Sequence, residues 1–325
     1  MSAIEAHDLT KTYGKRVRAL DGLTFSASAG AVFALLGPNG AGKSTTIKIL
    51  TTLSRPDSGH ARVAGIDVLA DPARVRRAIG VVSQKPSFDP AATGRENLVL
   101  QGQIYDVTGR RLKQRVSALL ERFDLTEAAN RAARHYSGGM QRRLDIALGL
   151  LHEPEVLFLD EPTTGLDPEA RAEMWKEIGR LTEQERLTIL LTTHYLEEAD
   201  ELAAQLAIVD RGRIVAAGTP DELKSSLQGD SLQVELAELP ADGDVRRAIE
   251  GVTGLSEVAL EGRLLRARAS DGATAMPSLM AALHDSGHAV AKLSLSRPSL
   301  DDVYLRVAGR AFAEADSERP GETAA

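Results

Sequence analysis

The chain has 325 residues, of which 43% are hydrophobic and 26% charged, an ordinary balance for a globular protein that is long enough for more than one domain. Its formal net charge of −7 comes from interleaved acids and bases, so no basic patch indicates a nucleic-acid partner. Cysteine is absent, which excludes disulfides and agrees with a cytoplasmic protein, and no apolar run approaches the roughly 18 residues that span a bilayer.

The N-terminal part of the chain reads as three strands, a glycine-rich loop and a helix. Residues 1–11 are polar and mixed, unlike a signal peptide, so we expect any membrane role to depend on a partner chain. The strands are predicted at Ala3–His7, Val17–Phe25 and Ala31–Leu36, and the helix at Thr45–Leu53. This strand, loop and helix order is the arrangement that holds a nucleotide phosphate.

The loop itself carries the strongest chemical signal in the sequence. Its glycines let the backbone N–H groups point inward at an anion, and the helix that follows adds a partial positive charge. Lys43 is expected to reach the outer phosphates and Ser44 to hold Mg²⁺. We therefore predict ATP or a close relative as ligand, bound by Gly37, Pro38, Asn39, Gly40, Ala41, Gly42, Lys43, Ser44 and Thr45.

The next segment continues the α/β pattern and then becomes helical. After a strand near Ala61–Ala64, Asp71 and Pro72 read as an N-cap and first helical residue, and Ile79–Ser83 reads as a buried strand that ends at Gln84. Apolar residues then recur with helical spacing at Leu112, Val116, Leu119, Leu120 and Phe123. We interpret residues about 92–151 as a helical subdomain inserted in an α/β core.

Two adjacent carboxylates follow the apolar strand Val156–Leu159. An isolated Asp-Glu pair often only ends a strand, but beside a phosphate loop the pair suits ATP hydrolysis. Asp160 is predicted to hold Mg²⁺ together with Ser44, and Glu161 to act as the base for the attacking water.

The core is predicted to close with two more helices and a strand. Asp167 and Pro168 begin a helix, Leu187–Thr193 is an apolar strand, and a last helix starts at Thr219-Pro220. Alternating strands and helices indicate a largely parallel, doubly wound sheet with its ligand beyond the carboxyl ends of the strands. The predicted nucleotide domain is residues 1–228.

The pattern changes from Ser231 onward. The elements are predicted in the order β-α-β-β-α-β, which is the ferredoxin-like arrangement, with a short helix after Pro298. We predict an α+β accessory domain at 229–309 and a disordered acidic tail at 310–325. Packing that supports a dimer and regulation are both open roles for this domain.

One further motif identifies a family. The run from Tyr136 to Leu144 reads Tyr-Ser-Gly-Gly-Met-Gln-Arg-Arg-Leu and resembles the signature of the ATP-binding cassette (ABC) family. Alone it would be only a helix cap, with Ser137 at the N-terminus. The resemblance implies a P-loop cassette with an inserted helical subdomain, in which Ser137, Gly138 and Gly139 meet the γ-phosphate bound to the opposite subunit. ATP would then lie between two chains.

Other positions match the ABC family one by one. Gln84 resembles the glutamine that contacts Mg²⁺ and the attacking water, and His194 resembles the switch histidine at the γ-phosphate. Tyr13 fits the aromatic residue that stacks on adenine. Asp167, within Gly165-Leu166-Asp167, fits the loop that crosses to the other site. The resemblance thus implies Glu161, His194, Lys43 and Gln84 as catalytic residues and Ser44, Gln84 and Asp160 as metal ligands.

The signature departs from the usual family wording at Tyr136 and Met140, where leucine and glutamine are common. Since the Ser-Gly-Gly centre is intact, we expect full activity, with an effect of Met140 on coupling left open. All catalytic and signature residues lie on one chain, so two copies can form two competent sites. This favours a homodimer.

Within the family, the signature wording and the tail segment Pro298–Leu305 resemble the daunorubicin-resistance exporter ATPases. That resemblance implies a separate polytopic membrane permease, efflux of a drug or antibiotic, and a peripheral location on the inner face of the cell membrane. A soluble cassette ATPase acting on DNA or ribosomes is the alternative, weakened by the absence of a basic patch. A binding module without turnover is a third possibility, against which Glu161 argues.

Overall fold

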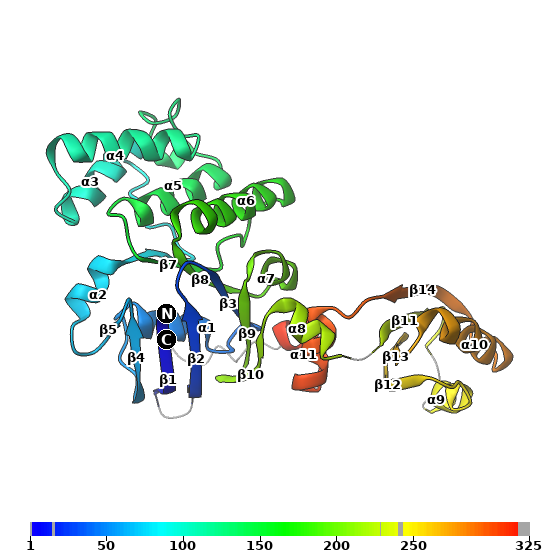
Figure 1. Ribbon diagram of the computed structural model, residues 1–325. Coiled ribbons are helices and arrows are strands. Elements are labelled where there is room, and N and C mark those ends of the chain that lie inside the picture. The colour runs from blue at the N-terminus through cyan, green and yellow to red at the C-terminus, as the bar shows by residue number, and fades with distance from the viewer. Residues whose placement is uncertain (1, 15–16, 228, 240–242, 318–325) are drawn as a thin grey trace. The chain divides into compact units, whose positions relative to one another are not determined.

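The computed structural model describes residues 2–14, 17–227, 229–239 and 243–317 (Figure 1). Contacts between residues divide the chain into two units, Met1–Pro220 with Phe312–Ala325 and Asp221–Ala311. The first boundary between them falls between Pro220 and Asp221, whereas the sequence suggested residue 228 as the end of the nucleotide domain; that limit stays a prediction.

The first unit is built on a six-stranded sheet. All of its neighbouring strands run parallel except the edge pair β9 and β10. β3 and β8 are buried at every residue, as expected for strands covered on both faces. The prediction of a largely parallel sheet is therefore confirmed. The order is β10 (Arg213–Gly218), β9 (Gln205–Asp210), β3 (Val32–Leu36), β8 (Thr188–Thr193), β7 (Val156–Asp160) and β6 (Ile79–Val82).

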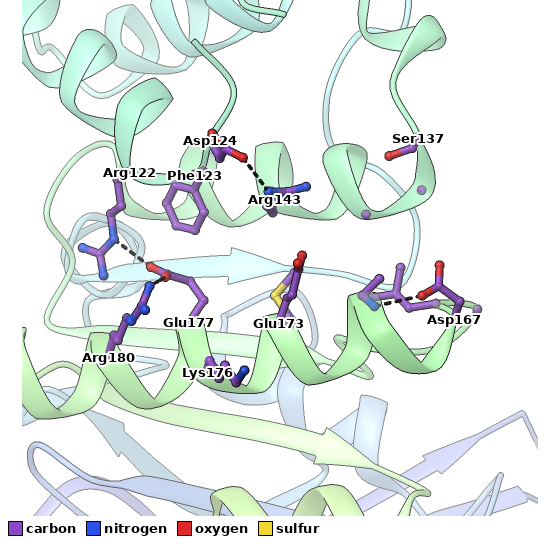
Figure 2. A pocket seen from close by; sticks show the side chains of 16 residues that line it. Arg122, Phe123, Asp124, Ser137, Arg143, Asp167, Glu173, Lys176, Glu177 and Arg180 are labelled. Carbon is purple, nitrogen blue, oxygen red and sulfur yellow. Dashed lines mark hydrogen bonds and ion pairs between the residues drawn. The ribbon is translucent and has the colours of Figure 1, made fainter. Parts of the chain in front are cut away.

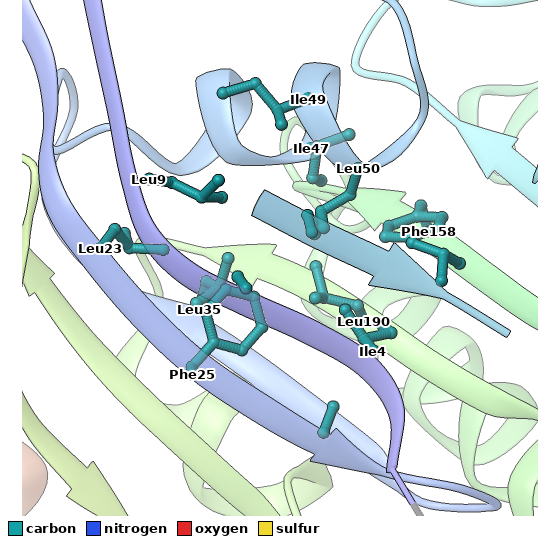
Figure 3. Packing of buried hydrophobic residues seen from close by; sticks show 14 of the residues in the cluster. Ile4, Leu9, Leu23, Phe25, Leu35, Ile47, Ile49, Leu50, Phe158 and Leu190 are labelled. Atoms are coloured by element: carbon teal, nitrogen blue, oxygen red, sulfur yellow. The ribbon is translucent and has the colours of Figure 1, made fainter. Parts of the chain in front are cut away.

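A second, antiparallel sheet covers the phosphate-loop helix α1 (Lys43–Leu50). Its order is β2 (Val17–Ser28), β1 (Ser2–Tyr13), β4 (Ser58–Val63) and β5 (Ile66–Asp67). Figure 3 shows Ile4 and Phe25 of this sheet packed with Ile47 of α1 and with Leu35 and Phe158 of the parallel sheet. This hydrophobic core holds α1, and so the loop before it, against both sheets.

Helices α3, α4 and α5 gather to one side of the six-stranded sheet (Figure 1). Leu112, Val116, Leu119 and Leu120 are all buried in α4, as their spacing predicts. Among the described residues, no helix combines the length and apolar character needed to cross a bilayer. Besides α1, the helices that precede the second unit in the chain are α2 (Pro72–Ala78), α3 (Gly94–Ile104), α4 (Gly109–Arg122), a 3₁₀ turn (Ala133–His135), α5 (Gly138–Leu150), α6 (Pro168–Glu185) and α7 (Leu196–Leu202).

The second unit has its own core and an antiparallel sheet in the order β12-β13-β11-β14. From β11 to β14 the elements follow β-α-β-β-α-β, which confirms the ferredoxin-like order expected from the sequence. The elements are α8 (Pro220–Ser225), β11 (Asp230–Leu236), α9 (Asp244–Ile249), β12 (Leu255–Glu261), β13 (Leu264–Ala269), α10 (Gly272–Asp285), β14 (Val290–Ser296) and α11 (Leu300–Ala308).

The sequence analysis missed several short elements, namely α7, β5, β9 and β10. Its prediction of a disordered tail from residue 310 is wrong for α12 (Phe312–Ser317). Phe312 and Ala315, three residues apart, share one helix face and are buried, which explains why this polar segment is ordered. Residues 318–325 lie outside the described part of the chain.

Candidate active site

The carboxyl ends of three neighbouring parallel strands bring the predicted catalytic residues together. β3 ends at the phosphate loop, β7 ends with Asp160 before Glu161, and β8 ends one residue before His194. Leu36 pairs with Thr193 and Asp160 pairs with Thr192 across these strands. Residues from three distant parts of the sequence therefore face one site.

The phosphate loop, Gly37–Gly42 between β3 and α1, has a conformation that requires its glycines. A Cβ atom on Gly37 would lie 2.3 Å from the Val209 carbonyl oxygen. Gly42 has a φ of 112°, and a Cβ atom there would lie 2.5 Å from the Ala19 carbonyl oxygen. No side chain fits at either position, so the backbone N–H groups can form a close anion cradle. Ser44 and Thr45 lie in the first turn of α1.

Lys43 is buried at the centre of this cradle. Its Nζ donates to the carbonyl oxygens of Gly37 (2.6 Å) and Pro38 (3.1 Å) and lies 3.5 Å from Oε1 of Glu161. Burial lowers the pKa of Lys43, and the neighbouring carboxylates, first Glu161, oppose that shift. The lysine side chain thus folds back on its own loop.

Ser44 and Asp160, two of the predicted metal ligands, lie within hydrogen-bonding distance of each other. The Ser44 hydroxyl donates to Oδ1 of Asp160 (3.2 Å), and Thr192 donates to the same oxygen (2.6 Å). A hydroxyl and a carboxylate are oxygen donors suited to Mg²⁺, which commonly takes one or two protein ligands and completes its shell with water and phosphate. Within the described residues, no cluster of three or more His, Asp or Glu side chains forms a self-sufficient metal site. The residues present fit a metal that arrives with the nucleotide.

Glu161 is held in a constrained conformation. Its φ is 49°, in the left-handed region, and its N–H donates to the carbonyl oxygen of Thr192 (3.1 Å). One carboxylate oxygen lies 3.2 Å from Nδ1 of His194 and accepts a hydrogen bond from Thr164 (3.3 Å). Burial opposes ionisation, but His194 and Lys43 outweigh it and hold the pKa of Glu161 below its ordinary value. The carboxylate is therefore ionised at neutral pH, as a base must be.

Two of the predicted site residues lie at the margin of this group. Gln84 follows β6 by two residues and is exposed, and since β6 pairs with β7 it lies at the same sheet edge as Asp160. Tyr13 ends β1 and is 40% exposed, with Nζ of Lys11 5.6 Å from its ring centroid. Their assigned contacts with Mg²⁺ and adenine stay predictions.

The signature residues line a separate cavity. Figure 2 shows Ser137 at the start of α5 facing Asp167 at the start of α6, across a cavity of about 580 Å³. Each residue caps its helix: Ser137 accepts from the Met140 N–H (3.3 Å) and Asp167 accepts from the Ala170 N–H (2.8 Å). Gly138, Gly139 and Gly165 line the same cavity. The structure therefore groups the four residues predicted to act on a partner's nucleotide.

Packing within the chain does not explain the signature glycines. A Cβ atom on Gly138 would meet nothing within 4 Å, and one on Gly139 would meet only the Ala170 Cβ at 3.6 Å. The unusual Tyr136 is buried, and its hydroxyl donates to the carbonyl oxygen of Ala128 (2.8 Å). Met140 lies beside Arg131, whose guanidinium approaches its sulfur at 3.4 Å. Both departures from the family wording are thus turned toward the helical subdomain.

Sequence reasoning missed a buried arginine that joins these regions. Arg142 of α5 donates to the carbonyl oxygens of Ser83 (2.7 Å) and Pro162 (2.6 Å), and lies 3.3 Å from that of Glu161. It therefore ties the signature helix to the strand ends that carry Gln84 and Glu161. Its partners are all backbone carbonyl oxygens, so no pattern of side chains in the sequence points to these contacts. Its place inside the signature motif was the one available sign of a role.

Comparisons with known proteins agree with this geometry. The family model "ABC transporter" matches residues 20–164, and the model "ATP-binding protein DrrA1-3-like, C-terminal domain" matches residues 218–308. The daunorubicin resistance ATP-binding protein DrrA2 of Streptomyces coeruleorubidus is 45% identical over 308 residues, 94% of this chain and 95% of the relative. The linearmycin resistance ATP-binding protein LnrL of Bacillus subtilis (strain 168) is 35% identical over 311 residues, 94% of this chain and 98% of the relative.

Solved structures show the same fold. The protein cbiO1 from Clostridium perfringens, part of the ABC transporter complex cbiONQ, matches with a TM-score of 0.64 and 26% identity over 69% of this chain and 91% of that one. The ATP-binding cassette MJ0796, in a dimeric post-hydrolysis state with ADP and Pi, matches with a TM-score of 0.61 and 25% identity over 66% of this chain and 98% of that one.

Proposed function

We propose, because this chain belongs to the ABC transporter family of ATP-binding proteins, that it is the ATPase subunit of an exporter for a drug, antibiotic or similar hydrophobic compound. Its similarity to resistance proteins over nearly the whole chain supports this function. The alternative, an ATPase acting on nucleic acid or ribosomes, has no comparable support.

The phosphate loop and Lys43 bind the ATP phosphates in this proposal. Because Lys43 Nζ donates to two loop carbonyls and lies near Glu161, it can turn to phosphate oxygens without breaking a hydrophobic contact. Ser44, Asp160 and Gln84 would hold Mg²⁺, which neutralises phosphate charge. Tyr13 would stack on adenine.

Glu161 accepts the proton of the attacking water, and His194 orients the carboxylate. The single observation that carries this assignment is the position of Glu161 between two cationic or hydrogen-bonding side chains, 3.5 Å from Lys43 and 3.2 Å from His194. Both distances are short enough to keep the carboxylate ionised beside the phosphates.

A second copy of the chain completes each site. Ser137, Gly138, Gly139 and Asp167 line a cavity of their own, and the open space at Gly138 leaves its backbone N–H accessible to an anion from outside the chain. Two copies arranged head to tail would give two equal sites. Closure of this homodimer on ATP would then do work on a polytopic permease, placing the chain at the inner face of the cell membrane.

Transport in membrane vesicles tests this function. Inside-out vesicles that contain a candidate permease should accumulate doxorubicin, as a probe compound, only when this chain and ATP are both present. The Glu161→Gln variant should bind to the same vesicles without supporting accumulation. ATP-independent accumulation, or accumulation equal with the variant, would refute an ATP-powered exporter.

A further inference from the structure

A buried carboxylate outside the described catalytic group joins three elements around the site. Glu198 of α7 is 0% exposed, and its Oε1 accepts hydrogen bonds from the Thr163 hydroxyl (2.8 Å) and the Trp175 indole N–H (3.1 Å). Thr163 lies in the segment after β7, and Trp175 lies in α6. Burying a carboxyl group costs free energy unless it is hydrogen-bonded, so these two donors hold Glu198 in one place.

Thr163 is the midpoint of the segment from Glu161 to Gly165. Its carbonyl oxygen accepts from the Leu166 N–H (3.2 Å), while the next residue, Thr164, donates to the Glu161 carboxylate (3.3 Å). A displacement of Thr163 would therefore move both the carboxylate of Glu161 and the loop that leads to Asp167.

The two helices that Glu198 joins, α7 and α6, each begin close to a predicted site residue. α7 begins two residues after His194, and α6 begins directly after Asp167. We propose that Glu198 is a positioning residue that locks the segment between Glu161 and Asp167 to the helices after His194 and Asp167. This inference rests on the proposed roles of those three residues, and it gives the loop that crosses to the second site a rigid link to the first.

Substitution of Glu198 by leucine and by glutamine tests this positioning role. Leucine removes the acceptor, and we expect kcat to fall about tenfold while KM for ATP changes less than about threefold. Glutamine has the same length and keeps an acceptor oxygen for Thr163 and Trp175, so kcat should return to within about threefold of the wild type.

Matched variants separate positioning from folding. Thr163→Val should reproduce the loss of kcat without adding to it in the double variant with Glu198→Leu, because both remove the hydrogen bond between Thr163 and Glu198. Thr182→Val on α6 removes a hydroxyl that bonds only its own helix and should leave kcat unchanged. A Glu198→Leu variant with wild-type kcat per nucleotide-binding site, whatever its thermal stability, would overturn the proposal.

Trp175 supplies a spectroscopic readout, since it is the single tryptophan of the chain. ATP added to the Glu161→Gln variant should shift its emission, and the shift should vanish when Glu198→Leu is added. If ATP leaves the emission spectrum of the Glu161→Gln variant unchanged, the proposed connection through Glu198 is contradicted. Hydrolysis lost by Glu161→Gln with no emission shift would leave the proposed function standing while removing the role of Glu198.

A different observation concerns the phosphate loop and the end of the described chain. The N–H of Asn39 donates to Oδ1 of Asp316 in α12 at 2.9 Å, although the two residues are 277 positions apart. Phe312 (4% exposed) and Ala315 (3% exposed) bury one face of this helix. The charge of Asp316 also acts on Lys43, so its carboxylate lies close to the cradle.

A carboxylate in this place resembles the ligand of the loop in charge and in acceptor oxygens. Backbone N–H groups of a phosphate loop bind anions, and the N–H of Asn39 can serve only one strong acceptor at a time. We infer that Asp316 competes with the phosphates of ATP, so that α12 restrains the phosphate loop and leaves it when nucleotide binds. This second inference rests on ATP binding by the loop.

Removal of the carboxylate tests the competition. Asp316→Ala should tighten ATP binding about tenfold, the lower end of the range for one hydrogen bond to a charged group, when measured by equilibrium titration in the Glu161→Gln background. Deletion of residues 312–325 should have the same effect. Deletion of residues 318–325 alone keeps Asp316 and should leave the affinity unchanged.

Each outcome is decisive for the role of Asp316. Unchanged or weaker ATP binding by Asp316→Ala would overturn the competition. Equal tightening by both deletions would assign the effect to residues 318–325 and also refute it. Failure of every variant, wild type included, to bind ATP would instead contradict the proposed function.

Discussion

Nζ of Lys43 lies 3.5 Å from Oε1 of Glu161, and both side chains are buried. The predicted phosphate-binding residue and the predicted base therefore form a buried ion pair. In the proposed function, an incoming phosphate would compete for Lys43 and leave Glu161 free to accept a proton from the water. Nucleotide binding and activation of the base would then be coupled.

Glu161→Gln should retain ATP binding and lose hydrolysis. The amide keeps the size of the side chain but cannot accept a proton, so kcat is expected to fall about 10²- to 10⁴-fold. Phosphate release measures the rate and equilibrium titration measures the affinity. A turnover rate equal to that of the wild type would remove Glu161 from its role.

Lys43→Ala should weaken nucleotide binding itself. The change removes a buried cation that would contact the outer phosphates, and charged hydrogen bonds of this kind are worth about 1.5–3 kcal/mol, or roughly 10- to 150-fold in affinity. Titration with a fluorescent ATP analogue measures the loss. An affinity within twofold of the wild type would contradict the assignment of the phosphate loop.

Gly138→Ala should impair ATP-dependent dimerisation without lowering the stability of the folded chain. Because an added Cβ meets nothing within the chain, the melting temperature should not fall, whereas the extra methyl would stand between the helix N-terminus and a partner's phosphate. We expect ATP-dependent dimerisation of the Glu161→Gln protein, measured by sedimentation, to be lost.

Gly179→Ala is the matched control for this variant. Gly179 lies within α6, and a Cβ atom there also meets nothing within 4 Å. The control should dimerise normally and be slightly more stable, since alanine favours a helix interior. Normal dimerisation of Gly138→Ala would show that Gly138 has no part in the contact between subunits.

The depressed pKa of Glu161 predicts a pH dependence of stability. A group whose pKa is lower in the folded state stabilises the protein at pH values above its ordinary pKa, about 4.3 for glutamate, and the contribution is lost as pH falls through the folded value. The melting-temperature advantage of wild type over Glu161→Gln should therefore be constant above about pH 5.5 and shrink below about pH 4.

His194→Ala tests the cause of that shift. It removes the neighbour that contributes most to the lowered pKa, so the loss of stability on acidification should be smaller than in the wild type and should be complete at a higher pH. Thermal melts between pH 3 and pH 7 measure both variants. An identical pH profile for His194→Ala would show that Lys43 alone holds the carboxylate ionised.

Much of the fold was predictable because it follows from local patterns. The buried runs at Val32–Leu36 and Thr188–Thr193 are strands, and the order of elements after Ser231 is ferredoxin-like, as their hydrophobic periods indicated. The edge strands β9 and β10 and the short helix α7 were missed. They have weak periodicity and owe their structure to neighbours already in place.

The sequence by itself determined which predicted site residues gather at one edge of the sheet. A glycine-rich loop, Asp160 with Glu161, and His194 each follow an apolar strand, and parallel strands must present their carboxyl ends at one edge of a sheet. Only the tertiary structure decided that Glu198 holds Thr163 and that Asp316 reaches Asn39. Such contacts join residues far apart in the chain, so no local period records them, and they exist only once the packed elements bring the side chains within hydrogen-bonding distance.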